Sequence, residues 1–424
     1  MKQKLLIILL AASVPFIANA QFGNVLGKLK SKVNQRIDRK VDKAIDETLD
    51  KTEKEATSGE PSTSEKKQGG KEEEAAITSF SKYDFVAGEQ IVYYDNFEQE
   101  TIAELPTGWN TNGTGEVVTI NNIPGKWLRL HQPFNYLTSN EKVFSENYTV
   151  EFDVIMQLKS NGWMYPTFSI GLIGTNGEPS TSNDFLRGYK KYSAMIATIY
   201  PGEYKTSKLK LESFLDGKSY FYSDVKPIGA LENYYGKPAH IAIQVQKERF
   251  RIWINETKAF DVPKGVANNY KMNQLLFQVS NTNYSEEQYG MYISNIKVAE
   301  GLPDTRHKLI DEGKFTTTAI LFDVNAATIK PESGGVLKEI ASALDQVKEF
   351  KIKIIGHTDT DGNDAANLSL SQKRAAAVKD ALVNEYGIDA SRIETDGKGE
   401  TVPVGDNKTK EGKARNRRVE FIKQ

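Results

Sequence analysis

Between Tyr83 and Glu300 the chain repeats short segments in which aromatic or β-branched residues mostly alternate with polar ones. Examples are "YTVEFDVIMQ", "HIAIQVQ" and "RFRIWIN", and turn pairs such as Asp216-Gly217 separate the segments. Successive side chains of a strand point to opposite faces, so a period of two indicates strands with one buried face. Some eleven or twelve such segments follow one another without a long helical pattern. We therefore predict an antiparallel β-sandwich of jelly-roll type for residues 80–300.

The pattern of apolar and polar residues changes after Gly301, and residues 301–314 are predicted to be a connector. Residues 315–424 alternate "TAILFDV", a helical pattern that opens at Pro331, "KIKII", a second helical pattern, "RIETDGKG" and "RRVEFI". Ser369 and Gln372 have the spacing of a capping box, so the second helix is predicted from about Ser369 to Tyr386. This order, β-α-β-α-β-β, is typical of a small α/β domain.

The first 79 residues divide into three further segments. Residues 1–20, "MKQKLLIILLAASVPFIANA", have the basic start, apolar centre and small-residue end of a secretory signal peptide. Residues 21–55 read as one charged amphipathic helix, and its opposed basic and acidic halves suit either self-association through residues 25–55 or a solvated helix with little packing. Residues 56–79 have the composition of a flexible, disordered linker.

Composition excludes several classes of function. The formal net charge of −1 gives no electrostatic basis for binding nucleic acid. The absence of cysteine excludes disulfides, thiol catalysis, zinc thiolate sites and a lipid-modified cysteine. None of the four histidines has metal-ligand spacing with another, so we expect no metal and no cofactor.

The segment "GHTDTDGNDAANLSLSQKRAAAV" places an acidic loop between a strand end and a helix start. This position is the usual location of a ligand in α/β folds. Arg374 and the free amides of the early helix attract a carboxylate, whereas Asp359 attracts an ammonium group. The spacing fits a pocket for an amino-acid head group, and a structural salt bridge between Asp359 and Arg374 is the alternative.

Four motifs in this region occur together in a recognisable order: "LFDVNAATIKPES", the segment above, "GKGETVPV" and "NKTKEGKARNRRVEF". Over about residues 315–424 the chain resembles the OmpA-like C-terminal domain that Pal and MotB proteins also contain. The resemblance implies non-covalent binding of peptidoglycan through the diaminopimelate of its stem peptide. It also implies that Asp359 binds the ammonium group of diaminopimelate and that Arg374 binds its carboxylate.

The same resemblance assigns further residues by motif position. Asn367 and Leu370 are expected to line the pocket, and Asp323 and Asn325 to form a second wall. Val324 departs from the small polar residue often found at its position. A final set is expected to be mainly structural: Asn416, Arg417 and Arg418. His357 is expected to make a hydrogen bond that packs the loop.

The β-rich region carries a weaker resemblance to concanavalin-like and laminin-G-like sandwiches, on "PTGWNTNGTG" and "GKWLRLH". Glu151 and Asp153 resemble part of the E-x-D-x-E strand of laminarinase-like hydrolases, but the third acidic position is Ile155, or Met156 if a bulge intervenes. Because these hydrolases need two carboxylates at the scissile bond, we expect no enzyme activity.

Other side chains of this region leave alternatives open. The four tryptophans are expected in the core, with stacking platforms for sugars as the alternative: Trp109, Trp127, Trp163 and Trp253. Asp184 and Asp216 suit either a calcium site or ordinary turns.

Together these features predict an exported cell-envelope protein, in the periplasm or associated with the outer membrane of a diderm bacterium. Its α/β domain is expected to hold peptidoglycan, while the sandwich faces a glycan or an envelope protein. The alternative is a carbohydrate-binding or glycan-degrading sandwich that uses the last domain only as an anchor.

Overall fold

The computed structural model describes residues 83–140, 142–179, 181–188, 192–267, 271–302 and 304–424. Residues 78–424 form one compact unit. The predicted signal peptide, the charged helix with its self-association, and the linker all fall within residues 1–82, which lie outside the described residues, so these predictions stay untested. In the described ranges no helix combines the length and the apolar character that a membrane crossing requires.

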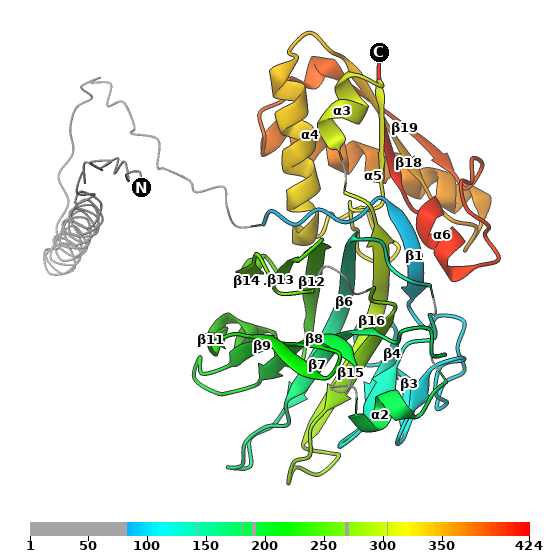
Figure 1. The fold of residues 1–424 in the computed structure, drawn as a ribbon. Coiled ribbons are helices and arrows are strands. Elements are labelled where there is room, and N and C mark those ends of the chain that lie inside the picture. The colour runs from blue at the N-terminus through cyan, green and yellow to red at the C-terminus, as the bar shows by residue number, and fades with distance from the viewer. Residues whose placement is uncertain (1–82, 141, 180, 189–191, 268–270, 303) are drawn as a thin grey trace, which may run out of the picture. The chain divides into compact units, whose positions relative to one another are not determined.

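Residues 83–300, here called the two-sheet domain, contain two antiparallel sheets (Figure 1). Sheet A has the order β14-β13-β12-β6-β16-β4-β3, with β1 paired to β16. Its described strands are β1 (Gln90–Asp95), β3 (Gly115–Ile120), β4 (Ile123–Leu130), β6 (Asn147–Leu158), β12 (Pro238–Gln246), β13 (Arg249–Ile254), β14 (Thr257–Val262) and β16 (Tyr289–Glu300).

Sheet B has the order β10-β9-β8-β7-β15-β5-β2, with β11 paired to β9. Its described strands are β2 (Asn110–Thr111), β5 (Asn135–Leu137), β7 (Phe168–Gly174), β8 (Ser193–Tyr200), β9 (Lys208–Leu215), β10 (Lys218–Tyr222), β11 (Lys226–Pro227) and β15 (Gln274–Val279). Two short helices, α2 (Asp184–Gly188) and η2 (Gly229–Tyr234), lie in its connections.

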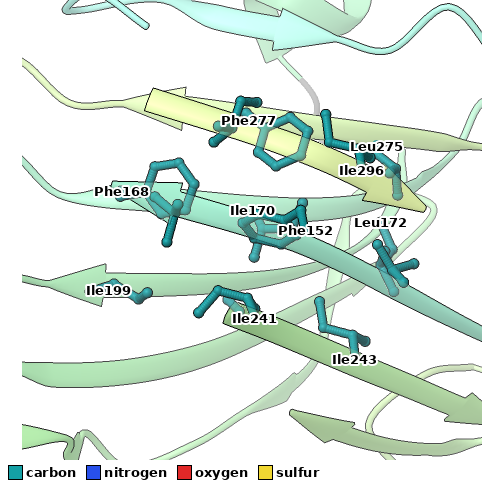
Figure 2. Packing of buried hydrophobic residues seen from close by; sticks show 14 of the residues in the cluster. Phe152, Phe168, Ile170, Leu172, Ile199, Ile241, Ile243, Leu275, Phe277 and Ile296 are labelled. Carbon is teal, nitrogen blue, oxygen red and sulfur yellow. The ribbon is translucent and has the colours of Figure 1, made fainter. Parts of the chain in front are cut away.

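The main hydrophobic core joins side chains of both sheets (Figure 2). Phe152 of β6 contacts Phe277 of β15 edge-on, with ring centroids 5.2 Å apart. Alternation along β6 sends Phe152 and Val154 into this core, whereas Glu151 and Asp153 point to the opposite, outer face of sheet A. Burying each large apolar side chain stabilises the domain by roughly 1.5–3 kcal/mol.

The predicted antiparallel β architecture is confirmed, and each of the eleven predicted segments contains a strand of the structure. The strands that the sequence did not reveal are short or weakly patterned, and they are β2, β3, β5, β10 and β11. The jelly-roll topology and the concanavalin-like resemblance stay predictions.

The chain from Lys314 onward, here called the C-terminal domain, contains a third sheet of order β17-β20-β18-β19. Only the β18–β19 pair is parallel among its described pairings. Its elements are β17 (Lys314–Thr317), η3 (Pro331–Ser333), α4 (Gly334–Gln346), β18 (Ile352–His357), α5 (Asp364–Asn384), η4 (Ala390–Arg392), β19 (Ile393–Gly399), α6 (Lys410–Asn416) and β20 (Val419–Lys423). The α/β class is confirmed.

Three details differ from the sequence prediction. The first strand is Lys314–Thr317, while the predicted segment "TAILFDV" contributes a single bridge between Phe322 and Ile329. Helix α5 begins at Asp364, because the Asn363 side chain accepts a hydrogen bond from Ala366 N at 2.8 Å and caps it earlier than Ser369. Two short helices were not predicted, namely α6 and α3 (Thr305–Ile310), which lies in the expected connector.

The outer face of sheet A packs against the C-terminal domain within this compact unit. Trp253 and Ala242 of sheet A share a hydrophobic cluster with Val336 and Leu337 of α4. Gly335 permits the approach, since a Cβ there would lie 1.9 Å from the carbonyl oxygen of Phe85. Lys410 Nζ of α6 adds ion pairs to Asp95 at 2.9 Å and Glu100 at 2.6 Å.

Candidate functional site

A cleft of about 640 Å³ opens between the outer face of sheet A and the C-terminal domain. The six predicted site residues all line it, and they are Asp323, Asn325, Asp359, Asn367, Leu370 and Arg374. Sheet A contributes the opposite side, which includes Glu151, Asp153, His240, Asn295 and Lys297. The structure therefore brings the predicted residues together, and it adds a wall that the sequence did not reveal.

Asp359 lies in the loop after β18 and is largely buried, at 6% exposure. Its Oδ1 accepts a hydrogen bond from Asp361 N at 3.1 Å, and its Oδ2 pairs with the guanidinium of Arg417. Arg417 in turn stacks over the ring of Tyr94 from β1, 5.0 Å from the ring centroid. Asp359 thus pairs with Arg417, and the alternative of a salt bridge to Arg374 is not what the structure shows.

Arg374 sits in the middle of α5, so the expectation that it lies at the helix start was wrong. Its Nε donates to Ala326 O at 3.0 Å, and its guanidinium stacks 4.8 Å from the ring centroid of Phe322. Burial lowers the pKa of Arg374 and nearby Arg417 lowers it further, while Asp359 raises it. Among the described residues no carboxylate forms an ion pair with Arg374, so a cation is held at the cleft with its charge uncompensated by direct contact.

Asn367 holds the acidic loop in place. Its Nδ2 donates to Asp359 O at 3.3 Å, to Asp361 O at 3.1 Å and to Glu400 Oε2 at 2.6 Å. Because its amide already bridges these acceptors, Asn367 positions the loop that carries Asp359. Leu370, one turn before Arg374 on α5, supplies apolar lining to the same cleft.

The segment with Asp323 and Asn325 forms an exposed rim of the cleft. Asn325 adopts a left-handed conformation with φ of 54°, which asparagine tolerates better than most residues. Val324 between them is 62% exposed. The rim therefore offers two polar side chains and one apolar side chain to solvent.

Of the residues expected to be structural, Asn416 is structural, whereas Arg417 takes part in the cleft. Asn416 is buried and its side chain bonds Gly405 in both directions, which fits the expectation. Arg417 instead reaches the cleft and holds Asp359. The ring of His357 makes no hydrogen bond to the described protein atoms, so its predicted bond is absent, and burial and nearby Arg418 lower its pKa to about 4.

The sheet A side of the cleft carries two directly opposed ion pairs. Lys297 of β16 lies opposite Glu151 of β6, with Nζ 2.8 Å from Oε1. His240 of β12 lies opposite Asp153, with Nδ1 2.8 Å from Oδ1. Asn295 Nδ2 donates to the other oxygen of Asp153 at 2.8 Å. We call Glu151, Asp153, His240 and Lys297 the sheet A cluster.

The tryptophans are only partly as expected. Trp109 belongs to the core between the two sheets, as expected. Trp127 and Trp253 are also buried, but Trp253 belongs to the cluster that sheet A shares with the C-terminal domain, and Trp163 is 63% exposed. For the open question of calcium, the described residues contain no group of three acidic or histidine side chains arranged to hold a metal ion.

Comparison with known proteins supports the interpretation of the C-terminal domain. The model of the OmpA family matches residues 321–417. Outer-membrane lipoprotein YfiB of Pseudomonas aeruginosa is 39% identical over 137 residues, which cover 32% of this chain and 79% of that protein. The chain belongs to the OmpA family. The predicted resemblance is thereby confirmed for this part of the chain.

Two further proteins are similar to a part of this chain. Outer membrane porin F of Pseudomonas aeruginosa is 45% identical over 101 residues, or 24% of this chain and 29% of that protein. The peptidoglycan-associated lipoprotein of Burkholderia pseudomallei is 30% identical, with 25% of this chain and 88% of that chain covered and a TM-score of 0.23. The OmpA-family chain spans 29% to 51% of the length of several curated relatives that it matches.

Proposed function

We propose that this protein binds peptidoglycan non-covalently through the diaminopimelate of its stem peptides and thereby tethers the two-sheet domain to the cell wall or outer membrane. The observation that carries the proposal is the placement of Arg374, a partly buried cation that has no carboxylate partner among the described residues, on the same cleft as Asp359. Diaminopimelate carries an ammonium and a carboxylate on one carbon, so its head group matches this pair of charges.

The ion pair between Asp359 and Arg417 is compatible with ligand binding. A carboxylate offers about four lone-pair positions, and Arg417 and Asp361 N occupy only part of them. The ligand ammonium can therefore add to Asp359 while its carboxylate reaches Arg374. Each charge-assisted hydrogen bond is worth roughly 1.5–3 kcal/mol.

Family membership supports the same proposal. The relatives are named as outer membrane proteins and an outer-membrane lipoprotein, which favours an exported protein of the envelope of a diderm bacterium, in the periplasm or associated with the outer membrane. We also infer that the two sheets form a jelly-roll-type sandwich, since strands of both sheets share one core.

The test is co-sedimentation of the full chain with purified peptidoglycan that contains diaminopimelate. Asp359→Asn and Arg374→Met should each abolish pelleting, because losing one partner of such a contact costs roughly 2–5 kcal/mol. Asp380→Asn and Arg306→Met are matched controls, since both residues are exposed. The proposal fails if wild-type protein stays in the supernatant, or if folded Asp359 and Arg374 variants pellet as the controls do.

We propose further that the two-sheet domain has no glycosidase activity. Burial raises the pKa of Glu151, but pairing with Lys297 and His240 lowers it overall. Burial likewise raises the pKa of Asp153, and pairing with His240 again lowers it overall. Both carboxyl groups are therefore ionised at neutral pH, whereas a glycosidase needs one protonated carboxylic acid. Incubation with β-glucans should release no reducing ends.

Trp163 favours a second candidate function, glycan binding by the two-sheet domain. Trp163 and neighbouring Met164 are 63% and 90% exposed, and an exposed indole is a typical stacking surface for a sugar ring. On a glycan array, binding that disappears in Trp163→Ala would support this role if it persists in Tyr204→Ala, a control that removes another exposed aromatic side chain. A blank array with wild-type protein would reject it.

A further inference from the structure

The sheet A cluster is an unusual feature for the outer face of a sheet. Its side chains are at most 9% exposed, because the C-terminal domain covers this face. Transferring charges out of water is costly unless they are paired. Here the pairs are directly opposed across neighbouring strands, so the register of β6, β12 and β16 places each cation against a carboxylate. The cluster is therefore a preorganised polar wall of the cleft.

The C-terminal domain adds a further cation, Lys330, beside this wall. Lys330, which follows the rim segment, approaches Asp153 Oδ2 to only 4.0 Å. Its side chain is 32% exposed, and it lines the same cleft. Burial lowers the pKa of His240, but its two carboxylate neighbours raise it to about 10 overall, so His240 is a cation at neutral pH. His240 and Lys297 each lie 2.8 Å from a carboxylate of the sheet A cluster, whereas Lys330 lies 4.0 Å from Asp153, so Lys330 has the most distant partner of the three cations.

The cleft also has more room than the proposed head group requires. Its volume of about 640 Å³ lies in the range of pockets that hold drug-sized ligands, roughly 300–1,000 Å³. Asp359 and Arg374 line the cleft from the C-terminal domain, and the sheet A cluster lines it from the two-sheet domain, with Lys330 of the C-terminal domain 4.0 Å from Asp153. A ligand held by its diaminopimelate can therefore extend toward Lys330, whose nearest carboxylate in the sheet A cluster is 4.0 Å away.

We propose that Lys330 and the sheet A cluster form a second subsite, which binds the free carboxylate of the residue that precedes diaminopimelate in a stem peptide. This inference rests on the proposed function. In such peptides a glutamyl residue is joined through its side-chain carboxyl group, so its α-carboxylate is free. Lys330 donates to that carboxylate, in place of its distant contact with Asp153. The two-sheet domain thus takes part in recognition of the peptide.

Calorimetry on the full chain with three probes tests the subsite. The probes are diaminopimelate alone, the γ-glutamyl-diaminopimelate dipeptide, and the same dipeptide with its glutamyl α-carboxylate amidated. Wild-type protein should bind the free-carboxylate dipeptide about tenfold more tightly than the amidated one. In Lys330→Gln this preference should vanish while binding of diaminopimelate alone is unchanged. Lys348→Gln, a change of an exposed lysine on the same domain, should keep the preference.

A second variant should change the preference for the free-carboxylate dipeptide in the opposite direction. Asp153→Asn removes the carboxylate that competes for Lys330, so it should increase the preference for the free-carboxylate dipeptide, provided that circular dichroism shows a folded protein. Equal affinities of wild-type protein for the two dipeptides, or a preference that survives Lys330→Gln, would overturn the second subsite while leaving the first intact. If wild-type protein binds none of the probes, the proposed function itself is wrong and the subsite falls with it.

Discussion

His240 should stabilise the fold as a buried cation, and replacing it should have a pH-dependent cost. The imidazole is 7% exposed. Its Nδ1 lies 2.8 Å from Asp153 and its Nε2 lies 3.5 Å from Glu151. Burial alone would lower its pKa, but the two carboxylates raise it to about 10. His240→Gln removes this cation and leaves two carboxylates with fewer partners.

The sign of the pH dependence follows from linkage. The folded-state pKa lies above the ordinary value of about 6.5, so the contribution of His240 is complete below pH 6.5 and is lost as the pH rises toward 10. One pKa unit corresponds to about 1.4 kcal/mol, so the loss amounts to several kcal/mol across this window. At pH 6 the variant should be less stable than wild type by roughly 3–5 kcal/mol, the usual cost of breaking a buried ion pair.

Urea denaturation of both proteins at pH 6, 8 and 10, followed by far-ultraviolet circular dichroism, measures the difference. The stability gap between wild type and His240→Gln should be largest at pH 6 and should narrow as the pH rises. His307→Gln replaces an exposed histidine and should show a small gap at every pH. A gap for His240→Gln that stays constant from pH 6 to 10 would show that His240 is not protonated, and the argument would be wrong.

Three further substitutions test how the C-terminal domain is built and attached, each by urea denaturation. Lys410→Met leaves buried Asp95 without its cation and should lower the free energy of unfolding by roughly 2–4 kcal/mol, whereas exposed Lys408→Met should have little effect. Gly335→Ala places a methyl group against Phe85 O and should cost roughly 1–3 kcal/mol, whereas Gly334→Ala meets open space and should be neutral or stabilising. Asn363→Ala removes the cap of α5 and should cost about 1 kcal/mol, unlike Asn384→Ala at the exposed end of the helix.

The longer strands of the two-sheet domain were predictable because apolar side chains recur at every second position along many of them. In β6 the inward side chains Phe152 and Val154 alternate with Glu151 and Asp153, and this alternation is visible without any partner strand. Strands such as β2 and β11 are only two residues long and carry no such period. Their pairing depends on neighbouring strands, which a local pattern does not reveal.

The start of α5 was misplaced because the local signals for capping compete. Ser369 and Gln372 have capping-box spacing, yet Asn363 caps the helix six residues earlier. The first turns of α5 are polar and largely exposed, so apolar periodicity marks only the later turns. The error placed Arg374 at the start of the helix instead of in its interior. The explanation that linked Arg374 to the free amides of the helix start was therefore wrong as well. Stacking on Phe322 and the hydrogen bond to Ala326 hold Arg374 in place, so the helix dipole is not what positions it.

Family motifs identified Asp359 and Arg374, but they did not indicate what faces them. Tyr94 and Asp359 are far apart in the sequence, and Arg417 links them only in the folded chain. Arg417 was expected to be structural because its motif closes the domain. Its contact with Asp359 shows that the same residue also shapes the cleft.

The two domains contribute different charged side chains to the cleft at the sheet A cluster. Glu151 and Asp153 receive their cations from Lys297 and His240, which lie on the adjacent strands of the same sheet. These pairs are therefore set by the register of sheet A, independently of the C-terminal domain. That domain contributes Lys330, whose partner Asp153 is more distant than the partners of Lys297 and His240. The proposed recognition of a second carboxylate would accordingly depend on contact between the two domains, whereas the proposed head-group contacts would involve only Asp359 and Arg374 of the C-terminal domain.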